Sequence, residues 1–184
     1  MEEKVLVQRS KEGDQEAFSA LVNKYKTKVF RLAFSLTHDQ DIADDLAQEA
    51  FIRAYLSLPK FKQKSEFGTW LYRITVNHTM DYLRKKTRRK EVPLEDFAIS
   101  QGEETLTPEK DKEEEQKRTI LYRSLDELPE KYRVILTLRD RQRFSYAEIA
   151  KILKVSPGTV DSRLHRAREM LRKKIRPFLE RRRP

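Results

Sequence analysis

The chain contains no cysteine and very little glycine, and each absence excludes a class of structure or chemistry. Its 184 residues include 0 Cys and 4 Gly. Without cysteine there is no disulfide, no thiol nucleophile, and no cysteine-based zinc site or redox switch. The sequence also contains no glycine-rich phosphate loop. Because no segment alternates polar and apolar residues, a substantial β-sheet is not expected, and the fold class predicted is all-α.

Long apolar segments are also absent. The N-terminal sequence MEEKVLVQRSKEGDQ lacks the apolar core of a signal peptide, and no apolar run approaches the length of a membrane span. We therefore expect a cytoplasmic protein that does not insert into a membrane. The three histidines, His38, His78 and His165, do not have the spacing of metal ligands, and no serine elbow is present. The sequence thus predicts no enzyme, no metal site and no cofactor.

Charge is abundant and unevenly distributed. Lys and Arg number 40 against 30 Asp and Glu, which gives a formal net charge of +10. Residues 1–90 carry +6, residues 91–117 carry −7, and residues 118–184 carry +11. Two basic modules joined by an acidic segment indicate a polyanionic partner that is bound at two places. A membrane-surface protein is the alternative, but no basic amphipathic helix with an aromatic face stands out.

The segment FSYAEIAKILKVSPGTVDSRLHRARE, residues 144–169, has the pattern of a helix-turn-helix. Ser156 suits the N-cap of the second helix and Pro157 its first position, whereas Lys154 stands in the turn, where Gly is often found. The first helix, Tyr146–Leu153, is expected to bury three apolar residues: Ile149, Ala150 and Leu153. The exposed face of the second helix keeps side chains that can bond base edges or phosphates: Thr159, Asp161, Ser162, Arg163, His165, Arg166 and Arg168. The alternative is a helical hairpin with a solvated basic face.

Residues 1–90 predict a first helical module. Asp14 can cap a helix whose apolar residues recur at three- and four-residue spacing: Phe18, Leu21, Val22, Tyr25, Val29 and Leu32. Asp39 or Asp41 opens a second helix, which the sequence Leu58–Pro59 ends. A polar loop then leads into a third long helix, predicted over 67–86.

A second module is predicted over residues 113–184. Residues 91–112, with Pro93, Gly102 and Pro108 among acidic residues, have the composition of a flexible acidic linker. A helix follows the sequence KDKEEEQK, Pro129 opens the next helix, and the helix-turn-helix completes a module of four helices. Since 38% of the residues are charged and 38% are hydrophobic, we expect two small helical cores rather than one large core.

Three blocks of sequence carry a resemblance to a known family. They are DDLAQEAFIRAY (residues 44–55), EFGTWLYRITVNHTMDYLRK (66–85) and LPEKYRVILTLRDRQRFSYAEIAKILKVSPGTVDSRLHRARE (128–169). In this order they resemble the extracytoplasmic-function group of sigma-70-type sigma factors, the dissociable subunits that give bacterial RNA polymerase its promoter specificity. The final IRPFLERRR looks most like the sigma-E subgroup. The resemblance covers nearly everything except the linker, and implies region 2 over 1–90 and region 4 over 113–184.

The first block implies a surface that binds core RNA polymerase. Asp45 and Gln48 lie on one carboxylate-rich helix face opposite the apolar stripe. From periodicity alone, an ordinary solvated face is the favoured alternative. The resemblance instead implies docking on the clamp helices of the largest polymerase subunit, within the motif Asp45–Leu58, by four residues: Asp45, Gln48, Glu49 and Arg53.

The second block implies contact with opened DNA. Its aromatic residues alternate with cations, as in proteins on which single-stranded bases stack while cations follow the backbone. Trp70 and Tyr72 have a purely structural alternative, as core residues. The resemblance implies that the loop Lys60–Thr69 captures a base flipped out of the minus-ten element, and that Asn77 contacts upstream bases. The residues expected to contact the minus-ten element are Phe61, Lys64, Ser65, Phe67, Trp70, Arg73, Asn77, Asp81 and Arg84.

The third block contains the helix-turn-helix motif Tyr146–His165. The resemblance implies that the second helix of this motif enters the major groove of the minus-thirty-five element. Arg166 is the candidate for bidentate contact with guanine, because its guanidinium matches the two acceptors of that base. Arg163 and Arg168 are expected to hold phosphates. The residues expected at this element are Thr159, Ser162, Arg163, His165, Arg166 and Arg168.

The resemblance further implies partners and regulation. They are core RNA polymerase, including the flap of its second-largest subunit, promoter DNA, and an anti-sigma factor acting in a stress response. Two other classes remain as alternatives: a two-domain regulator that binds DNA on its own, and a nuclease or recombinase with an accessory helix-turn-helix. The regulator needs neither the acidic nor the aromatic block, and the nuclease or recombinase needs a carboxylate or nucleophile cluster that the sequence lacks.

Overall fold

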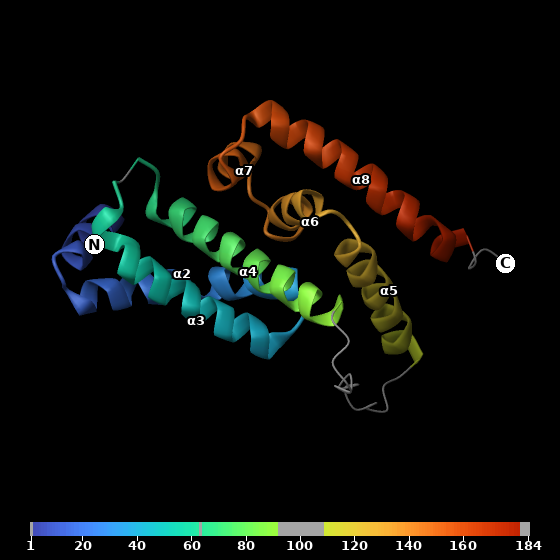
Figure 1. The fold of residues 1–184 in the computed structure, drawn as a ribbon, viewed down its shortest axis with the longest axis horizontal. Helices are drawn as coiled ribbons and strands as arrows, with labels where there is room; N and C mark the ends of the chain where they lie inside the picture. Colours follow the sequence, from blue (N-terminus) through green and yellow to red (C-terminus); the bar gives the residue numbers. More distant parts are fainter. Residues whose placement is uncertain (1, 63, 92–108, 181–184) are drawn as a thin grey trace.

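Every regular element is a helix in the residues that the structure, a computed structural model, describes: 2–62, 64–91 and 109–180 (Figure 1). The helices of the first module are α1 (Glu3–Lys11), α2 (Gln15–Thr37), α3 (Gln40–Ser57), the short 3-10 turn η1 (Leu58–Lys60) and α4 (Phe67–Glu91). Those of the second are α5 (Glu109–Asp126), α6 (Glu130–Leu136), the π-helical turn η2 (Thr137–Arg141), α7 (Tyr146–Leu153) and α8 (Pro157–Glu180). Within these ranges, no helix has the length and apolar character that a bilayer crossing requires.

The helices of the first module begin where the sequence predicts. The Asp14 carboxylate accepts a hydrogen bond from the Ala17 N–H at 2.9 Å, and the Asp39 carboxylate accepts one from Ile42 N–H at 3.1 Å. Each bond satisfies one of the backbone donors that a helix start leaves unpaired, so both predicted N-caps are confirmed. Helix α1, in contrast, was not predicted.

The second module contains the predicted four α-helices, with two differences. Helix α5 begins at Glu109, so residues 109–112 and Glu91 are helical although the linker was predicted over 91–112; the rest of that linker lies outside the described residues. In α7, Leu153 is only half-buried, and Ile152 is the residue that packs in the core beside Ile149 and Ala150. Leu153 still packs against the core while remaining partly exposed, and the buried residue that the sequence analysis did not name is Ile152.

The turn of the helix-turn-helix is built as its residue types suggest. Ser145 and Glu148 form a capping box at the start of α7, and the Ser156 hydroxyl accepts from Thr159 N–H at 3.1 Å at the start of α8. Lys154 adopts the left-handed conformation, with φ 54°, at the position where Gly is frequent. The predicted N-cap at Ser156 and the helix start at Pro157 are confirmed.

The two modules pack against each other through α4, and their apolar residues form one continuous cluster rather than two cores (Figure 1). Tyr72 of α4 meets the Phe144 ring with centroids 5.0 Å apart. The Gln142 amide, beyond η2, donates to the Ser35 hydroxyl at 2.9 Å and to the Arg31 carbonyl at 3.1 Å on α2. The modules are therefore joined by an aromatic contact and by hydrogen bonds.

His38 lies at this junction, in a largely buried site. Its ring stacks on Tyr122 of α5 with centroids 4.0 Å apart, neither ring nitrogen has a hydrogen-bond partner, and the side chain is 11% exposed. Asp126 lies 3.7 Å from Nε2, and Arg141 and Arg133 face the same ring. Burial lowers the His38 pKa, because the charged form loses its hydration, and the two arginines add to this effect against Asp126.

We expect the free energy of unfolding to fall as pH drops below about 6.5, the pKa of an unfolded histidine. The unfolded chain then binds a proton that the folded chain rejects, so stability is present above this pH and is lost below it. His38→Asn removes the titrating group, and Asn tolerates the left-handed backbone at this position, φ 57°. Urea unfolding at about pH 7.5 and 5.5 should show a smaller loss in this variant than in the wild type. Equal losses would show that His38 is not responsible.

Candidate nucleic-acid interface

Helix α3 presents an exposed carboxylate-rich face. Asp45, Gln48 and Glu49 are all exposed, and the predicted Arg53 is exposed one turn later. The Gln48 amide donates to Asp44 at 2.8 Å, and Glu49 lies 2.7 Å from Nε2 of His78 on α4. Among the described residues, no Lys or Arg forms an ion pair with Asp45 or Glu49, although Glu49 is in contact with His78.

An apolar strip continues this face along α3. Ile52 and Leu56 are 58% and 71% exposed, and the Tyr55 ring between them meets Phe18 of α2 edge-on at 4.9 Å. The strip borders a groove of about 370 Å³ between α2 and α3. The prediction included these residues in the motif 45–58 without a role. The signal that was missed is the helical spacing: Ile52 lies three and four residues after Glu49 and Gln48, and Tyr55 and Leu56 lie three and four residues after Ile52.

Helix α4 arranges the polar minus-ten candidates on a single face. Asn77, Asp81 and Arg84 are exposed, whereas Arg73 is half-buried. The first three line a cavity of about 690 Å³ together with residues of the second module. Arg84 pairs with Asp81 and also with Glu130 of α6, at 3.4 Å.

Residues of the second module line this cavity together with the α4 face. Arg163 of α8, a minus-thirty-five candidate, lines the same cavity and is half-buried. The Arg84 guanidinium, which the sequence predicts to contact the minus-ten element, forms an ion pair with Glu130. The structure therefore places residues of both predicted DNA surfaces at the junction between the modules.

The aromatic candidates form a packed cluster. Phe61 and Phe67 are only 6% and 2% exposed, and Phe61 stacks on the half-buried Trp70 with centroids 4.6 Å apart. Rings buried in this way offer no face to a DNA base, so direct stacking on Phe61 and Phe67 does not match the structure. They pack instead because aromatic rings gain most from burial against one another. The structural interpretation also holds for Tyr72, which is buried.

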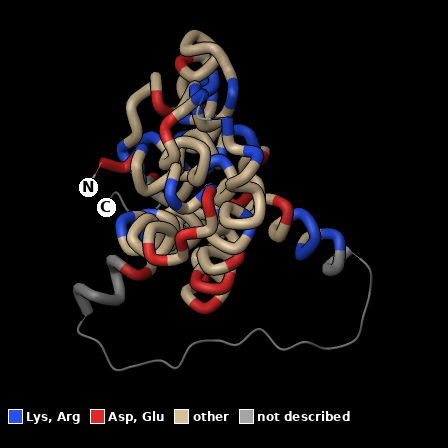
Figure 2. The backbone as a smooth tube through the Cα atoms, turned by 90° about the vertical axis from the view of Figure 1, so that its left-hand side faces the viewer, with Lys and Arg blue, Asp and Glu red and all other residues tan. Residues whose placement is uncertain are grey.

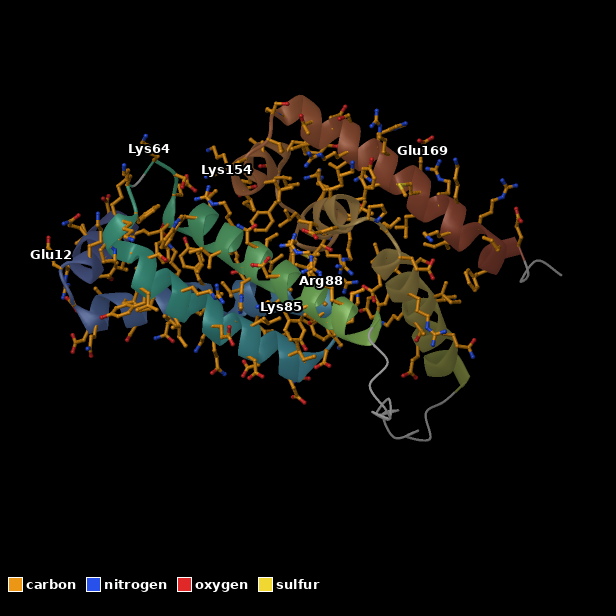
Figure 3. All side chains as sticks on the ribbon, in the orientation of Figure 1. Glu12, Lys64, Lys85, Arg88, Lys154 and Glu169 are labelled. Carbon is orange, nitrogen blue, oxygen red and sulfur yellow. The ribbon has the colours of Figure 1, made fainter. Side chains whose placement is uncertain are left out.

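The polar loop residues between η1 and α4 are accessible. Lys64 is exposed and Ser65 half-buried, and Figure 3 shows Lys64 pointing outward from this loop. A hollow of about 840 Å³ lies beside the loop, and its lining includes Glu3, Lys24 and Tyr25 of α1 and α2. Sequence reasoning missed Glu3 because it did not predict α1, and it assigned Tyr25 to the core of the first module rather than to the site.

Helix α8 presents most of the minus-thirty-five candidates to solvent. Ser162, His165, Arg166 and Arg168 are exposed, whereas Thr159 is half-buried with its hydroxyl 2.8 Å from that of Ser156. Figure 2 shows that basic and acidic residues both occur across the molecule, so the basic helix face is a local feature.

Arg168 is the one exposed basic candidate on α8 with an acidic partner in another element. It donates to the Asp140 carboxylate of η2 at 2.7 Å, and this bond raises the Arg168 pKa. A phosphate that binds Arg168 has to compete with Asp140. Arg166 has no hydrogen bond to η2 in the part of the chain that the structure describes. Among the described residues, no three His, Asp or Glu side chains are grouped as a metal ion would require.

Comparison with known proteins adds sequence and fold relatives. The Sigma-70 region 2 family matches residues 21–89, and the Sigma-70, region 4 family matches residues 118–171. The RNA polymerase sigma-H factor of Pseudomonas aeruginosa is 39% identical over 181 residues, covering 95% of this chain and 94% of that protein. The ECF RNA polymerase sigma-E factor of Escherichia coli is 40% identical over 188 residues, covering 97% of each.

A solved structure is similar over most of the fold. It is the sigma factor RpoE of Bartonella quintana in complex with the anti-sigma factor NepR, 25% identical with a TM-score of 0.60. The match covers 86% of this chain and 96% of that chain. The similarity therefore extends over both helical modules.

Proposed function

The chain belongs to the extracytoplasmic-function sigma factors of the sigma-70 family, and on this premise we propose how its surfaces divide the work of transcription initiation. Helix α3 binds core RNA polymerase, α8 reads the minus-thirty-five element in the major groove, and α4 with the preceding loop opens the minus-ten element. The module that ends with α4 is region 2, and the module that begins with α5 is region 4. The polymerase supplies catalysis, and this subunit supplies promoter choice.

One observation carries the proposal: the chain combines an exposed carboxylate face on α3 with an exposed basic face on α8. Phosphates are repelled by the first face and attracted by the second. The apolar strip of Ile52, Tyr55 and Leu56 beside the carboxylates supports a protein partner there, since interface cores are rich in apolar and aromatic residues.

DNA binding and polymerase binding are coupled in this proposal. In the packed arrangement Asn77 and Arg84 face the second module, and Glu130 holds Arg84. Polymerase binding separates the modules and places each one over its own promoter element. The free chain consequently binds promoter DNA weakly, and the holoenzyme binds it well.

We also propose that an anti-sigma factor controls the chain as part of a stress response. Support comes from the similarity to the Bartonella sigma factor that was solved with its anti-sigma factor, and from the relatives named sigma-E. The test is whether such a partner, once purified, blocks the co-elution of the chain with core RNA polymerase.

Asn77→Ala tests the assignment of α4. The variant should lower the permanganate reactivity of minus-ten thymines about two- to tenfold, because a single hydrogen bond contributes a net of about 0.5–1.5 kcal/mol. Core binding should not change. The matched control is Asn23→Ala, which removes an exposed amide from α2 instead. Unchanged reactivity in Asn77→Ala would assign α4 a structural role only.

A further inference from the structure

Helix α1 contacts the loop that precedes α4, and the function proposed so far gives it no role. It lies outside residues 21–89, the part of the chain that matches the region 2 family. The described residues 60–62 and 64–69, which run from the end of η1 to the first turn of α4, are named the capture loop. Helix α1 reaches the capture loop directly at its start and, through α2, at its end.

The start of the capture loop is tied by Lys11. Its ammonium group donates a hydrogen bond to the Phe61 carbonyl at 3.1 Å, across 50 positions of sequence. Phe61 is the residue at which the η1 turn ends, and its ring is fixed by stacking on Trp70. The Lys11 bond therefore holds the backbone at the point where the chain leaves η1.

The end of the capture loop is fixed by Tyr25 of α2. A Cβ atom added at Gly68 would lie 2.8 Å from the Tyr25 hydroxyl and ring, closer than non-bonded atoms approach. Only glycine permits this contact, and the Tyr25 ring also meets Phe67 with centroids 5.7 Å apart. The first turn of α4 therefore rests on the Tyr25 ring.

Helix α1 in turn fixes the Tyr25 hydroxyl. That hydroxyl donates to the Glu3 carboxylate at 2.6 Å, and Lys24 pairs with the same carboxylate. Burial, and then the bond to Glu3, raise the Tyr25 pKa, so the hydroxyl stays protonated and keeps donating. For Glu3, burial raises the pKa, but the bonds from Lys24 and Tyr25 outweigh it and lower the pKa overall. The carboxylate therefore stays charged as the acceptor.

Between these two ties lies the 840 Å³ hollow. Glu3, Lys24 and Tyr25 line it from α1 and α2, and Lys64 and Ser65 line it from the capture loop. Its volume is within the range of sites that enclose small ligands, about 300–1,000 Å³, which is ample for one nucleobase. Three carboxylates and three lysines line the hollow in all: Glu2, Glu3, Glu66, Lys4, Lys24 and Lys64. Lys24 is paired with Glu3, so the exposed Lys64 is the lysine of the capture loop that can meet an attached phosphate.

We propose that Lys11, Tyr25 and Glu3 are positioning residues, which hold the capture loop in the shape that receives one unstacked base of the minus-ten element. The inference rests on the proposed function, since it assigns a base to this loop. A loop that is already ordered loses less conformational entropy when the base binds, so affinity rises without any direct contact to DNA.

The test uses the full chain bound to core RNA polymerase and a fluorescent fork-junction DNA with a single-stranded minus-ten segment. Each unpaired base is replaced in turn by an abasic site, and Kd is measured for each DNA. In the wild type one position should lose about tenfold or more in affinity, which corresponds to about 1.4 kcal/mol. In Lys11→Met and in Tyr25→Phe that loss should shrink to about twofold or less, the size expected of a position without specific capture.

Matched variants separate positioning from general damage. Lys26→Met removes the same charge from an exposed site on α2 and should behave as the wild type, while Lys11→Arg should restore the tenfold loss. The proposal is overturned if Lys11→Met and Tyr25→Phe keep the full loss at that position, or if they weaken binding equally to every DNA. A wild type without any position-specific loss would instead refute base capture by the loop, and with it the function assigned there. Because Lys11 is only half-buried, Lys11→Met alone decides the test if Tyr25→Phe fails to fold.

Discussion

Replacing Asp45, Gln48 and Glu49 together by Ala should weaken binding to core RNA polymerase by about 100-fold or more. Interfaces depend on a few residues that each contribute about 2 kcal/mol or more, and two such losses already exceed this factor. The three side chains are exposed, so helicity and melting temperature should stay close to wild type. Co-elution with core enzyme and a binding titration measure the effect.

The control for this triple variant removes the same number of charges elsewhere. Glu12→Ala with Glu16→Ala removes two exposed carboxylates, one at the C-cap of α1 and one in the first turn of α2, and it should leave core binding unchanged. If the control and the triple variant bind equally well, the acidic face of α3 is only a solvated surface. If both lose binding, the effect is one of net charge and not of a docking site.

Arg166→Ala should remove discrimination at one base pair of the minus-thirty-five element, by about 1–3 kcal/mol, since a bidentate contact to guanine is worth this much. Arg166 is exposed on α8, one residue from the buried Ala167 that packs the helix onto its module. Holoenzyme binding to a set of promoters with single base-pair changes measures the effect. Other positions should keep their wild-type preferences.

Arg168→Ala is the comparison for a phosphate contact. It should weaken binding to every sequence alike and reduce the dependence on salt, because phosphate contacts carry no sequence information. The bond of Arg168 to Asp140 makes this loss smaller than that of an unpaired arginine. Uniform losses in both variants would show that Arg166, too, contacts only phosphate.

The local features of the fold were predictable from the sequence. Asp14, Asp39 and Ser156 cap helices because their side chains and positions allow it, and the apolar spacing of the following residues sets which face is buried. The exposed positions of Asp45 and Arg166 follow from the same periodicity. These predictions depend only on residues that are close together in the sequence, which explains why the structure agrees with them.

Helix α1 was missed because its sequence, EKVLVQRSK, carries little local signal. The helix is 9 residues long, and its N-cap, Glu2, makes no side-chain capping bond. Short helices of this kind are marginal alone and depend on packing, here of Val7 in the core and of Lys11 on Phe61. The residues that α1 contributes to the capture loop were missed for the same reason.

The packing of the two modules against each other could not be predicted from the sequence of either module. Tyr72 and Phe144 are each ordinary apolar residues of their own module, and their contact joins segments far apart in the sequence. The hydrogen bond from the Gln142 amide, just beyond η2, to Ser35 of α2 likewise joins residues far apart in the sequence. Only the assembled structure shows that Asn77 and Arg84 face the second module.

Transcription from a library of DNA fragments with randomised upstream sequence tests the central claim most directly. Core RNA polymerase with this chain should produce transcripts whose templates share two short elements at a fixed separation. Core enzyme alone, or core enzyme with the Asp45, Gln48 and Glu49 triple variant, should not enrich them. The claim is contradicted if the chain enriches no elements beyond those of core enzyme alone, or if the free chain selects the same DNA without polymerase.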